Sequence, residues 1–326
     1  MTFAHIISLE NLLAAWREFR RGKRHKPDVA DFEFNLEDNL FSLQEDLASE
    51  IYKLGQYSSF FIRDPKLRHI HKATVRDRVL HQAVFRSLYP SFERCFIYDS
   101  YSCRLRKGTH AGVTRLDTLA RKLSQNYQLP IWALKCDIRK FFDSVEHAIL
   151  FRLLARTIFD GRILKLLEKI IFSFSTSPGK GLPLGNVTSQ LFANIYLHEL
   201  DWFMKHKLRQ KFYLRYCDDF IILSPNRQEL INLLPLLKDF LRQKLSLELQ
   251  SKKITVRKSR QGIDFLGYVV RPHYWVLRTK TRRRFCRRLL CGMVTEATLP
   301  SYLGLINYCR DFKLRRLLLT ASKFIC

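Results

Sequence analysis

Two adjacent acids, Asp218 and Asp219, stand between two apolar segments, 212–216 and 220–223, whose residues favour β-strands. This pattern predicts a hairpin with two carboxylates at its tip. A tight turn prefers Gly or Asn, so the turn alone does not explain an Asp-Asp pair. Like charges at the foot of two hydrophobic strands repel each other, which favours a bound cation. The alternative is a solvated acidic turn, which is a common feature of hairpins.

A third acid has a matching position upstream. Asp137 ends an apolar segment of strand length, residues 129–137. A carboxylate at the end of a buried strand, beside an acid-tipped hairpin, gives an oxygen-rich cluster suited to Mg²⁺. Two such ions about 3.5 to 4 Å apart can activate a hydroxyl nucleophile and hold the leaving oxygen in phosphoryl transfer. Asp143 is the weaker candidate and is predicted to cap a helix instead.

Three motifs carry a resemblance to a known family. They are residues 134–143 around Asp137, residues 181–197, and Tyr216-Cys-Asp-Asp219. Their order and spacing resemble the palm motifs of reverse transcriptases, and about residues 50–310 resemble the bacterial branch that includes group II intron enzymes. The segment Leu184-Gly-Asn-Val-Thr-Ser-Gln190 is most similar to reverse transcriptases of diversity-generating retroelements, because other relatives usually begin it with Gln-Gly and often end it with Pro.

The resemblance implies an α+β protein with the right-hand polymerase fold: fingers, a palm with an antiparallel sheet, and a short helical thumb. The expected parts follow in chain order: an N-terminal helical extension (1–49), fingers (50–128), a palm (129–275) with a finger-like helical insertion at about 148–178, and a thumb (276–326).

The implied activity is RNA-directed DNA polymerisation, a nucleotidyl transfer. The template would be a retroelement RNA, copied into cDNA with errors at adenines that diversify a target gene, as in mutagenic retrohoming. The metal-binding set would be Asp137, Ile138, Asp218 and Asp219, holding two Mg²⁺ ions for which Mn²⁺ could substitute. The implied partners are template RNA, the RNA/cDNA duplex, deoxynucleoside triphosphates and a small basic, oligomeric accessory variability protein.

Two alternatives remain open. One is a group II intron-derived or retron-like reverse transcriptase. The other is a non-catalytic RNA-binding splicing or defence factor with the same fold. The presence of all three acids and of Phe142 argues against the second alternative.

Basic and apolar residues are expected at the nucleotide. Lys66 and Arg68 lie two apart, so on a strand both point to one face and can bracket one anion. Basic residues at this place hold the triphosphate in the resembled family, although an ordinary basic strand face would have the same sequence. In the resembled family an aromatic residue five positions past the first acid excludes a 2′-hydroxyl, which implies this role for Phe142. The alternative for Phe142 is packing in the core, a role expected of Phe141.

The segment 178–186 cannot be regular, because Gly and Pro interrupt it; it predicts a loop leading into a helix from Thr188 or Ser189. Gly185 would allow close approach to a base pair, and Gln190 is assigned to the same site. Leu184 stands where many relatives carry Gln. An apolar side chain there favours selection of the base pair by shape, with tolerance of mispairs opposite adenine.

The other expected contacts are basic or glycine residues. Lys253 aligns with a lysine that assists departing pyrophosphate, with Lys252 as the alternative. Arg104 and Lys107 would line the template and primer path, and Gly267 would approach the primer end. The basic segment 278–288 predicts a thumb helix on a duplex backbone. Its assigned contacts are Arg282, Arg283 and Arg287.

Composition agrees with a nucleic-acid partner. The chain has 326 residues, 57 Lys and Arg against 30 Asp and Glu, and a net charge of +27. Such an excess implies a polyanion, and 47% hydrophobic residues exclude a disordered basic tail as the whole protein. A membrane surface competes, but no apolar run approaches roughly 18 residues. The basic cluster 20–27 fits either RNA contact or a solvated face.

Cellular location follows from the same sequence. The eight cysteines form no Cys-x-x-Cys pair and no zinc-finger spacing, which indicates reduced thiols. The N-terminus has no signal-peptide pattern. We therefore expect a cytoplasmic protein without membrane partners, encoded by a bacterial host or a phage.

Apolar periodicity predicts the remaining elements. Helices are expected at 7–21, 35–53 and 228–245 and near Thr109, and one or two helices at 148–175. Strands are expected at 58–63, 64–70 and 247–256. Asp77, between two arginines at the start of a further helix, is expected to pair with one of them.

Overall fold

The computed structural model describes residues 2–63, 67–291 and 299–309. The chain forms two compact units. The first contains Met1–Tyr98, Ile138–Phe203 and Asp239–Glu248, and the second contains Asp99–Asp137, Met204–Lys238 and Leu249–Cys326. Helices and antiparallel sheets occur together, so the predicted α+β class is confirmed. The predicted boundaries of extension, fingers, palm and thumb stay predictions.

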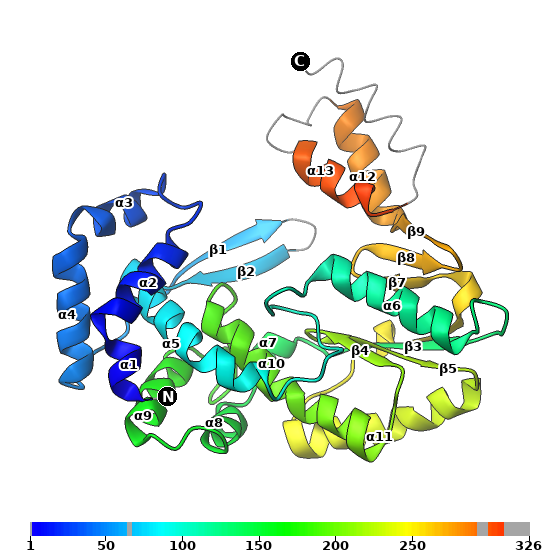
Figure 1. Ribbon diagram of the computed structural model, residues 1–326, viewed down its shortest axis with the longest axis horizontal. Coiled ribbons are helices and arrows are strands. Elements are labelled where there is room, and N and C mark those ends of the chain that lie inside the picture. Colours follow the sequence, from blue (N-terminus) through cyan, green and yellow to red (C-terminus); the bar gives the residue numbers. More distant parts are fainter. Residues whose placement is uncertain (1, 64–66, 292–298, 310–326) are drawn as a thin grey trace. The chain divides into compact units, whose positions relative to one another are not determined.

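The first unit is built around α5 (Val75–Glu93), against which α2 (Leu9–Phe19) and α10 (Val187–Trp202) both pack (Figure 1). Its other helices are α1 (Phe3–Ile7), α3 (Pro27–Phe34), α4 (Leu36–Ala48), α7 (Phe141–Ser144), α8 (His147–Ala155) and α9 (Gly161–Phe172). The helix expected at 7–21 is observed as α2, which begins two residues later and ends two residues earlier than expected. Ser8 is extended and its side chain accepts from the Asn11 amide, which starts a new helix after α1.

A two-stranded hairpin belongs to the same unit. It pairs β1 (Ser58–Arg63) with β2 (Leu67–Lys72), with Phe61 opposite His69. The strand expected at 58–63 is confirmed, but every residue of β1 is exposed. Lys66 lies outside the described residues.

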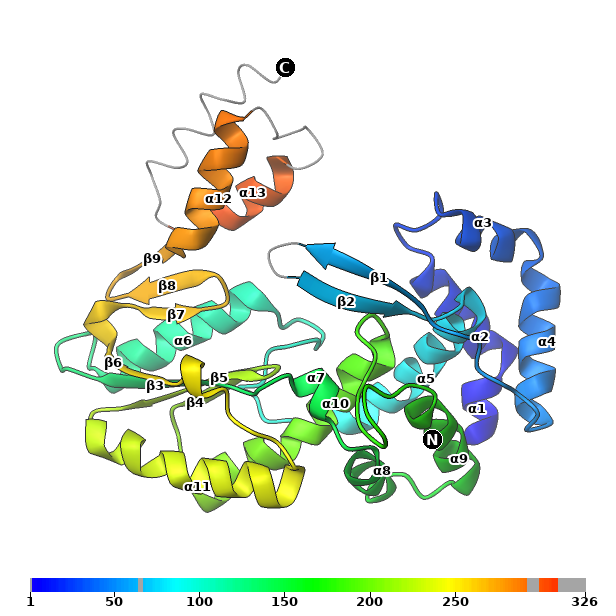
Figure 2. The same cartoon turned by 180° about the vertical axis from the view of Figure 1, so that it is seen from behind.

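The second unit contains a four-stranded antiparallel sheet in the order β4-β5-β3-β6. Its strands are Tyr213–Tyr216, Asp219–Ser224, Trp132–Asp137 and Thr255–Lys258, in that order. Helix α6 (Thr109–Leu123) packs on β4 and β5, and α11 (Arg227–Leu245) runs along the opposite face of the sheet (Figures 1 and 2). The residues of β3, β4 and β5 are mostly buried, whereas β6, at the edge of the sheet, has two exposed and two half-buried residues.

The remaining described elements follow in chain order. A π-helical segment, Phe203–Lys207, continues from α10, and 3₁₀ turns occupy Ser251–Lys253 and Ser259–Gln261. A second antiparallel sheet joins β7 (Ile263–Phe265), β8 (Tyr268–Arg271) and β9 (Tyr274–Leu277), and α12 (Thr279–Leu290) and α13 (Leu299–Asn307) come after it. Among the helices of the described ranges, none combines the length and apolarity needed to cross a bilayer.

Two local predictions are wrong. The strand expected at 247–256 begins only at Thr255, because the preceding residues form a 3₁₀ turn. Asp143 does not cap a helix; it lies inside α7, and Glu146 occupies the N-cap of α8 without a side-chain bond.

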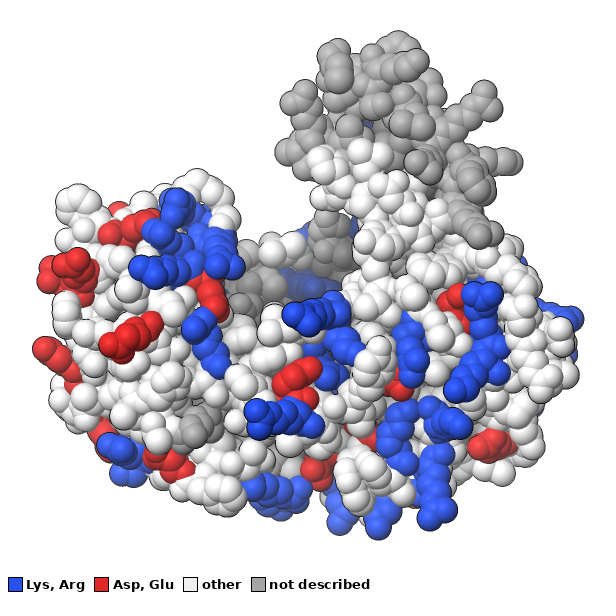
Figure 3. Space-filling view, viewed as in Figure 1, with Lys and Arg blue, Asp and Glu red and all other residues white. Residues whose placement is uncertain are grey.

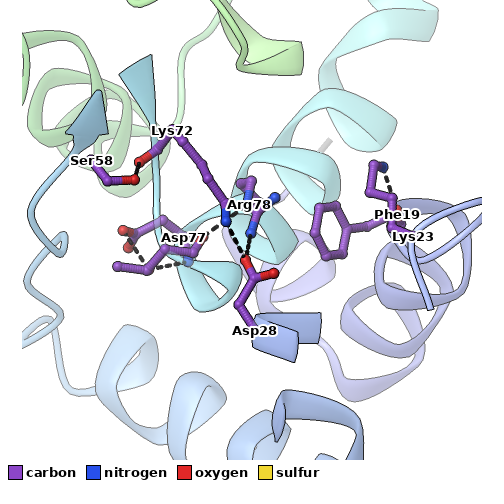
Figure 4. Close-up of polar contacts among 8 residues, drawn as sticks. Phe19, Lys23, Asp28, Ser58, Lys72, Asp77 and Arg78 are labelled. Atoms are coloured by element: carbon purple, nitrogen blue, oxygen red, sulfur yellow. Dashed lines mark hydrogen bonds and ion pairs between the residues drawn. The ribbon is translucent and has the colours of Figure 1, made fainter. Parts of the chain in front are cut away.

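Asp77 pairs with neither of the two arginines beside it in the sequence, so the predicted ion pair is also wrong. It is buried and accepts from Tyr52, Thr74 and the Gly55 amide. Arg78 instead reaches Asp28 at 2.6 Å, which Lys72 also contacts at 2.7 Å (Figure 4). Burial raises the pKa of Asp28, but the bonds from Lys72 and Arg78 outweigh it and lower that pKa overall. Asp28 thereby joins α3 to both β2 and α5.

A buried polar network connects α5 to the start of α10. The His81 ring meets the Thr188 hydroxyl at 2.8 Å and the Asn186 amide nitrogen at 3.4 Å, and that nitrogen also donates to the Tyr57 hydroxyl at 3.1 Å. His81 is 1% exposed. Burial lowers the pKa of His81 to about 4.

This network predicts acid sensitivity at one residue. Above the ordinary histidine pKa of about 6.5, His81 is neutral in both folded and unfolded chains. As the pH falls from about 6.5 towards 4, the unfolded chain takes up the proton first, so the free energy of unfolding decreases by about 3 kcal/mol from this residue. Denaturant titrations at pH 7 and pH 4 measure the free energy of unfolding of wild type and of His81→Gln. The difference between the two proteins should be about 3 kcal/mol smaller at pH 4 than at pH 7. The exposed His25, changed to Gln, is the control, and a pH-independent difference for His81→Gln contradicts the prediction.

Candidate active site

The paired acids lie at the tip of the β4–β5 hairpin, as predicted. Tyr216 pairs with Asp219, so the two-residue turn consists of Cys217 and Asp218. Cys217 has a φ of 53°, a left-handed conformation that glycine normally supplies. Arg215, which is completely buried, donates from Nη1 to the Cys217 carbonyl oxygen at 3.1 Å and from Nη2 to the Ser100 hydroxyl at 3.1 Å. The guanidinium thereby holds the turn from inside the unit.

The sheet brings the third acid to the hairpin. Asp137 is the direct partner of Asp219 in the β3–β5 pairing, and opposite residues on neighbouring strands have Cβ atoms only about 4.5 to 5.5 Å apart. Burial, and next the charge of Asp137, raise the pKa of Asp218. Burial raises the pKa of Asp219 to about 6 against the opposing effect of Lys135, with smaller contributions from Asp137 and Asp218.

Two lysines bind this acid cluster. Lys253 Nζ lies 2.6 Å from Asp137 Oδ1, and Lys135 Nζ lies 3.0 Å from Asp219 Oδ2. Lys253 therefore reaches the acids from its 3₁₀ turn. Sequence reasoning missed Lys135, although its position two residues before Asp137 on one strand places both side chains on the same face.

The donor set fits a divalent cation. Asp219 Oδ1 is buried and has no hydrogen-bond partner among the described residues, so one carboxylate oxygen is left for a ligand. Clustered carboxylate oxygens are the donors that Mg²⁺ and Mn²⁺ bind. In the described ranges no three Asp, Glu, His or Cys side chains already converge as a complete ligand group. Ile138 is buried, so only its backbone carbonyl could join such a site.

A separate cavity in the first unit contains residues assigned to the nucleotide. It has a volume of about 750 Å³, and Arg68 and Leu184 both line it. The Leu184 carbonyl oxygen accepts from the His71 amide at 3.1 Å, which joins the loop to β2. Gly185 has a φ of 130°, and a Cβ there would lie 3.2 Å from the His71 carbonyl oxygen. Gly185 is therefore required for close approach to the hairpin backbone, a role different from contact with a base pair.

The two phenylalanines after Asp137 differ in burial, and Phe141 is the one that packs in the core, as expected. Phe141 is buried and packs edge-on against Tyr196. Phe142 is half-buried, and its carbonyl oxygen accepts from the Leu182 amide at 2.7 Å. Gln190 is exposed in the first turns of α10, whose start at Val187 lies within one residue of the prediction. Their roles at a nucleotide stay predictions.

The residues assigned to template and primer lie in the second unit. Arg104 donates to the Ser100 carbonyl oxygen at 2.8 Å, and Lys107 lies over the Tyr101 ring at 4.7 Å. Gly108, with a φ of 132°, is the N-cap of α6, which begins at Thr109 as predicted. Gly267 has a φ of 91° in the β7–β8 turn, and a Cβ there would meet no described atom within 4 Å. The turn conformation, rather than a lack of space, therefore requires glycine at this position.

Three arginines of the predicted thumb line one surface groove. Thr279, Arg282, Arg283, Cys286, Arg287 and Cys291 line a cavity of about 590 Å³ along α12. Arg278 differs from the others, because it precedes the helix and its Nε donates to Asp264 at 2.7 Å. Part of the predicted thumb, residues 292–298 and 310–326, lies outside the described residues.

Lys and Arg also gather over the segment between α2 and α3 (Figure 3). Arg20 pairs with Glu33, and Lys23 lies 4.5 Å from the centre of the Phe19 ring. Burial, with the nearby charges of Arg78 and Lys26, lowers the pKa of Lys23. Arg21 and Arg24 are exposed, so both interpretations of this cluster, RNA contact and a solvated face, stay open.

Comparison with known families identifies the chain. The sequence profile described as reverse transcriptase (RNA-dependent DNA polymerase) matches residues 62–270, more than half of the chain. The chain belongs to the reverse transcriptase family. Protein YkfC of Escherichia coli K12 is 24% identical over 241 residues, covering 62% of this chain and 63% of that protein. The group II intron-encoded protein LtrA of Lactococcus lactis subsp. cremoris is 25% identical over 315 residues, covering 76% and 50%.

A solved structure agrees on the fold. Telomerase from Candida albicans, in complex with a fragment of telomeric RNA, is similar with a TM-score of 0.53 and 13% identity, covering 88% of this chain and 61% of that chain. This similarity confirms the predicted right-hand polymerase fold. This reverse transcriptase spans only between half and two thirds of the length of YkfC and LtrA.

The α12 groove predicts salt-dependent binding. If Arg283 and Arg287 each neutralise one phosphate, changing either to Ala should reduce the slope of log affinity against log salt by about 1. The slope is measured by fluorescence anisotropy with an RNA/DNA duplex between roughly 50 and 200 mM salt. Arg242→Ala, which removes an exposed arginine on α11, is the control that should leave the slope unchanged. An unchanged slope in the α12 variants contradicts the assignment.

Proposed function

We propose that this chain is an RNA-directed DNA polymerase that extends a DNA primer along an RNA template. The observation that carries the proposal is the meeting of Asp137 and Asp219 in one strand pair, beside Asp218, with a buried Asp219 oxygen left without a partner in the described chain. Membership of the reverse transcriptase family supports it.

In the proposed reaction the primer 3′-hydroxyl attacks the α-phosphate of a deoxynucleoside triphosphate in line, and pyrophosphate leaves. Asp137, Asp218 and Asp219 would hold two divalent cations, Mg²⁺ or Mn²⁺, which would favour loss of the hydroxyl proton to solvent as the oxygen attacks and offset the negative charge on the phosphates. The three carboxylates fix where the reacting groups meet. Lys253, whose Nζ lies 2.6 Å from Asp137 Oδ1, would offer a positive charge or a proton to the departing pyrophosphate.

The proposed partners are polyanions. The net charge of +27 and the arginines along α12 favour template RNA and the RNA/cDNA duplex. The similarity to a group II intron-encoded protein supports the intron-like branch of the family.

A finer assignment rests on the 184–190 segment. Leu184 lines the cavity of the first unit with an apolar side chain where many relatives carry Gln. Such a residue supports selection by shape and tolerance of mispairs, as in the diversity-generating retroelement enzymes that this segment resembles. We extend the proposal to that subgroup, with a cytoplasmic enzyme and a small basic accessory protein; an intron-derived or retron-like enzyme is the alternative.

Removing one carboxylate tests the activity. Asp218→Asn keeps the size of the side chain but removes its charge, so primer extension on RNA should fall by about three orders of magnitude. Asp239→Asn, an exposed acid on α11, is the matched control. Template-primer binding and the circular dichroism spectrum should be unchanged in both. Extension at the wild-type rate by Asp218→Asn would refute the proposed chemistry.

Leu184→Gln tests the finer assignment. A new hydrogen bond of roughly 1 kcal/mol should lower misincorporation opposite template adenine about fivefold. Sequencing of cDNA from a defined RNA template measures it. Leu184→Met, which stays apolar with a similar volume, should keep the wild-type error rate. Equal error rates opposite adenine in Leu184→Gln and wild type count against the diversity-generating assignment.

A further inference from the structure

The helices α3 and α4 carry an acidic surface in a strongly basic chain. Residues 28–50 contain eight acids and no Lys, Arg or His, although the whole chain has a net charge of +27. Asp and Glu side chains gather over these two helices (Figure 3). Like charges repel RNA and anionic lipid from such a surface, so a partner for it must be cationic.

Only half of these acids have partners within the fold. Four form ion pairs with basic side chains: Asp28, Glu33, Asp46 and Glu50. The other four are exposed and pair with no residue of the described ranges: Asp31, Glu37, Asp38 and Glu45. A helix dipole favours acids in the first turn, as at Glu37 and Asp38, but disfavours one in the last turn of α4, as at Glu45. Helix stability therefore does not explain the whole set.

Two phenylalanines are exposed among the free acids. Phe34 is 89% exposed at the end of α3, three residues after Asp31. Phe41 is 50% exposed on α4, one turn from both Glu37 and Glu45 and away from the buried leucines of that helix. An exposed aromatic ring with charges around it is typical of an anchor at a protein interface. We call these two phenylalanines and the four free acids the acidic face.

A matching basic surface occurs on α12 of the same chain. Lys280, Arg283 and Arg287 are exposed, recur every three to four residues, and so form one stripe along this helix, which contains no acid. None of the three has an ion pair with another described residue. Arg283 and Arg287 also line the 590 Å³ groove beside Cys286. Such a groove suits an aromatic ring, because guanidinium groups stack on rings and sulfur packs against their edges.

The two surfaces also match in length. Glu37 and Glu45 are eight residues apart and Lys280 and Arg287 are seven apart, so at about 1.5 Å per residue both pairs span roughly 10 to 12 Å. We propose that the acidic face of one copy of this chain binds the α12 stripe of a second copy, with the Phe41 ring in the α12 groove. Because the two surfaces differ, the contact is heterologous and joins copies head to tail.

This contact competes with nucleic acid. The same arginines of α12 are assigned to an RNA/DNA duplex, so the chain would be associated when alone and released when duplex binds. Only this release rests on the proposed function, since the association needs no polymerase activity. A contact between so few side chains is at the small end of interface sizes, which predicts a dissociation constant of roughly 1 to 10 µM.

Sedimentation velocity of the full chain without nucleic acid measures the association. The mean sedimentation coefficient should rise with protein concentration in low salt and fall as added salt screens the charges. Phe41→Ser should weaken the association at least about tenfold, as for an interface anchor. Phe159→Ser removes a phenylalanine that is also 89% exposed but lies outside the acidic face, so it should associate as wild type does.

The charges are tested in the same way. Glu37→Gln combined with Glu45→Gln should weaken the association at least about tenfold. Glu168→Gln, which removes an exposed acid on α9, is the matched control and should have no effect.

A mixture of two variants identifies both surfaces. Phe41→Ser lacks the acidic anchor, and the double variant Arg283→Ala with Arg287→Ala lacks the stripe, so each alone should be monomeric. Mixed in equal amounts, they should form dimers of one copy of each and nothing larger, because one intact face still meets one intact stripe. A mixture that stays monomeric refutes the inference.

Duplex separates this inference from the proposed function. Saturating RNA/DNA duplex should return the wild-type chain to monomers, and Phe41→Ser should extend a primer at the wild-type rate. If the wild-type chain associates through Phe41 but extends no primer, the polymerase proposal fails and the inference stands. If primers are extended but the wild-type chain is monomeric at every concentration, the acidic face has a different partner and the inference is refuted. Oligomers that persist in saturating duplex also refute it.

Discussion

The pairing of β3 with β5 constrains the rest of the site. The same backbone hydrogen bonds that form the sheet place Asp137 opposite Asp219, so the fold cannot form without bringing these acids together. Burial raises the pKa values of Asp218 and Asp219, and the charge of Asp137 adds to this effect. The apolar sheet interior supplies stability, and Lys135 and Lys253 offset part of the charge.

Each unit holds one irregular backbone segment in place, but the side chains that do so differ in charge. In the second unit a buried cation, Arg215, supports a left-handed cysteine from behind the turn. In the first unit neutral groups do the positioning: His81, Thr188 and Asn186 fix the start of α10, and Gly185 allows the loop to touch the β2 backbone. Neutral groups suit a segment that borders a cavity rich in cations, since they add no competing charge.

Periodicity was sufficient for the elements with a strong apolar pattern. It predicted α11, β1 and the acid-tipped hairpin close to their observed bounds, and glycine and proline signals predicted where α6 and α10 begin. It failed where local backbone bonds decide. Ser8 caps α2, so this helix begins two residues later than expected. The Ser251–Lys253 turn delays a strand although its sequence alternates as a strand does. Side-chain partners were predicted least well. Asp77 binds hydroxyls and an amide, and the ion pair of Lys135 with Asp219 was missed. The contacts among the rings of Phe61, His69 and His71 depend on strand register, which composition does not reveal.

The exposed β1–β2 hairpin has little apolar burial of its own, and an isolated two-stranded hairpin is only marginally stable in water. Its described attachments include the bond from the His71 amide to the Leu184 carbonyl oxygen and the close contact at Gly185. The hairpin and the 184–186 loop should therefore open together, with the same free energy of opening. Amide hydrogens in β2 would then exchange with solvent at a rate set partly by the sequence of a loop more than a hundred residues away.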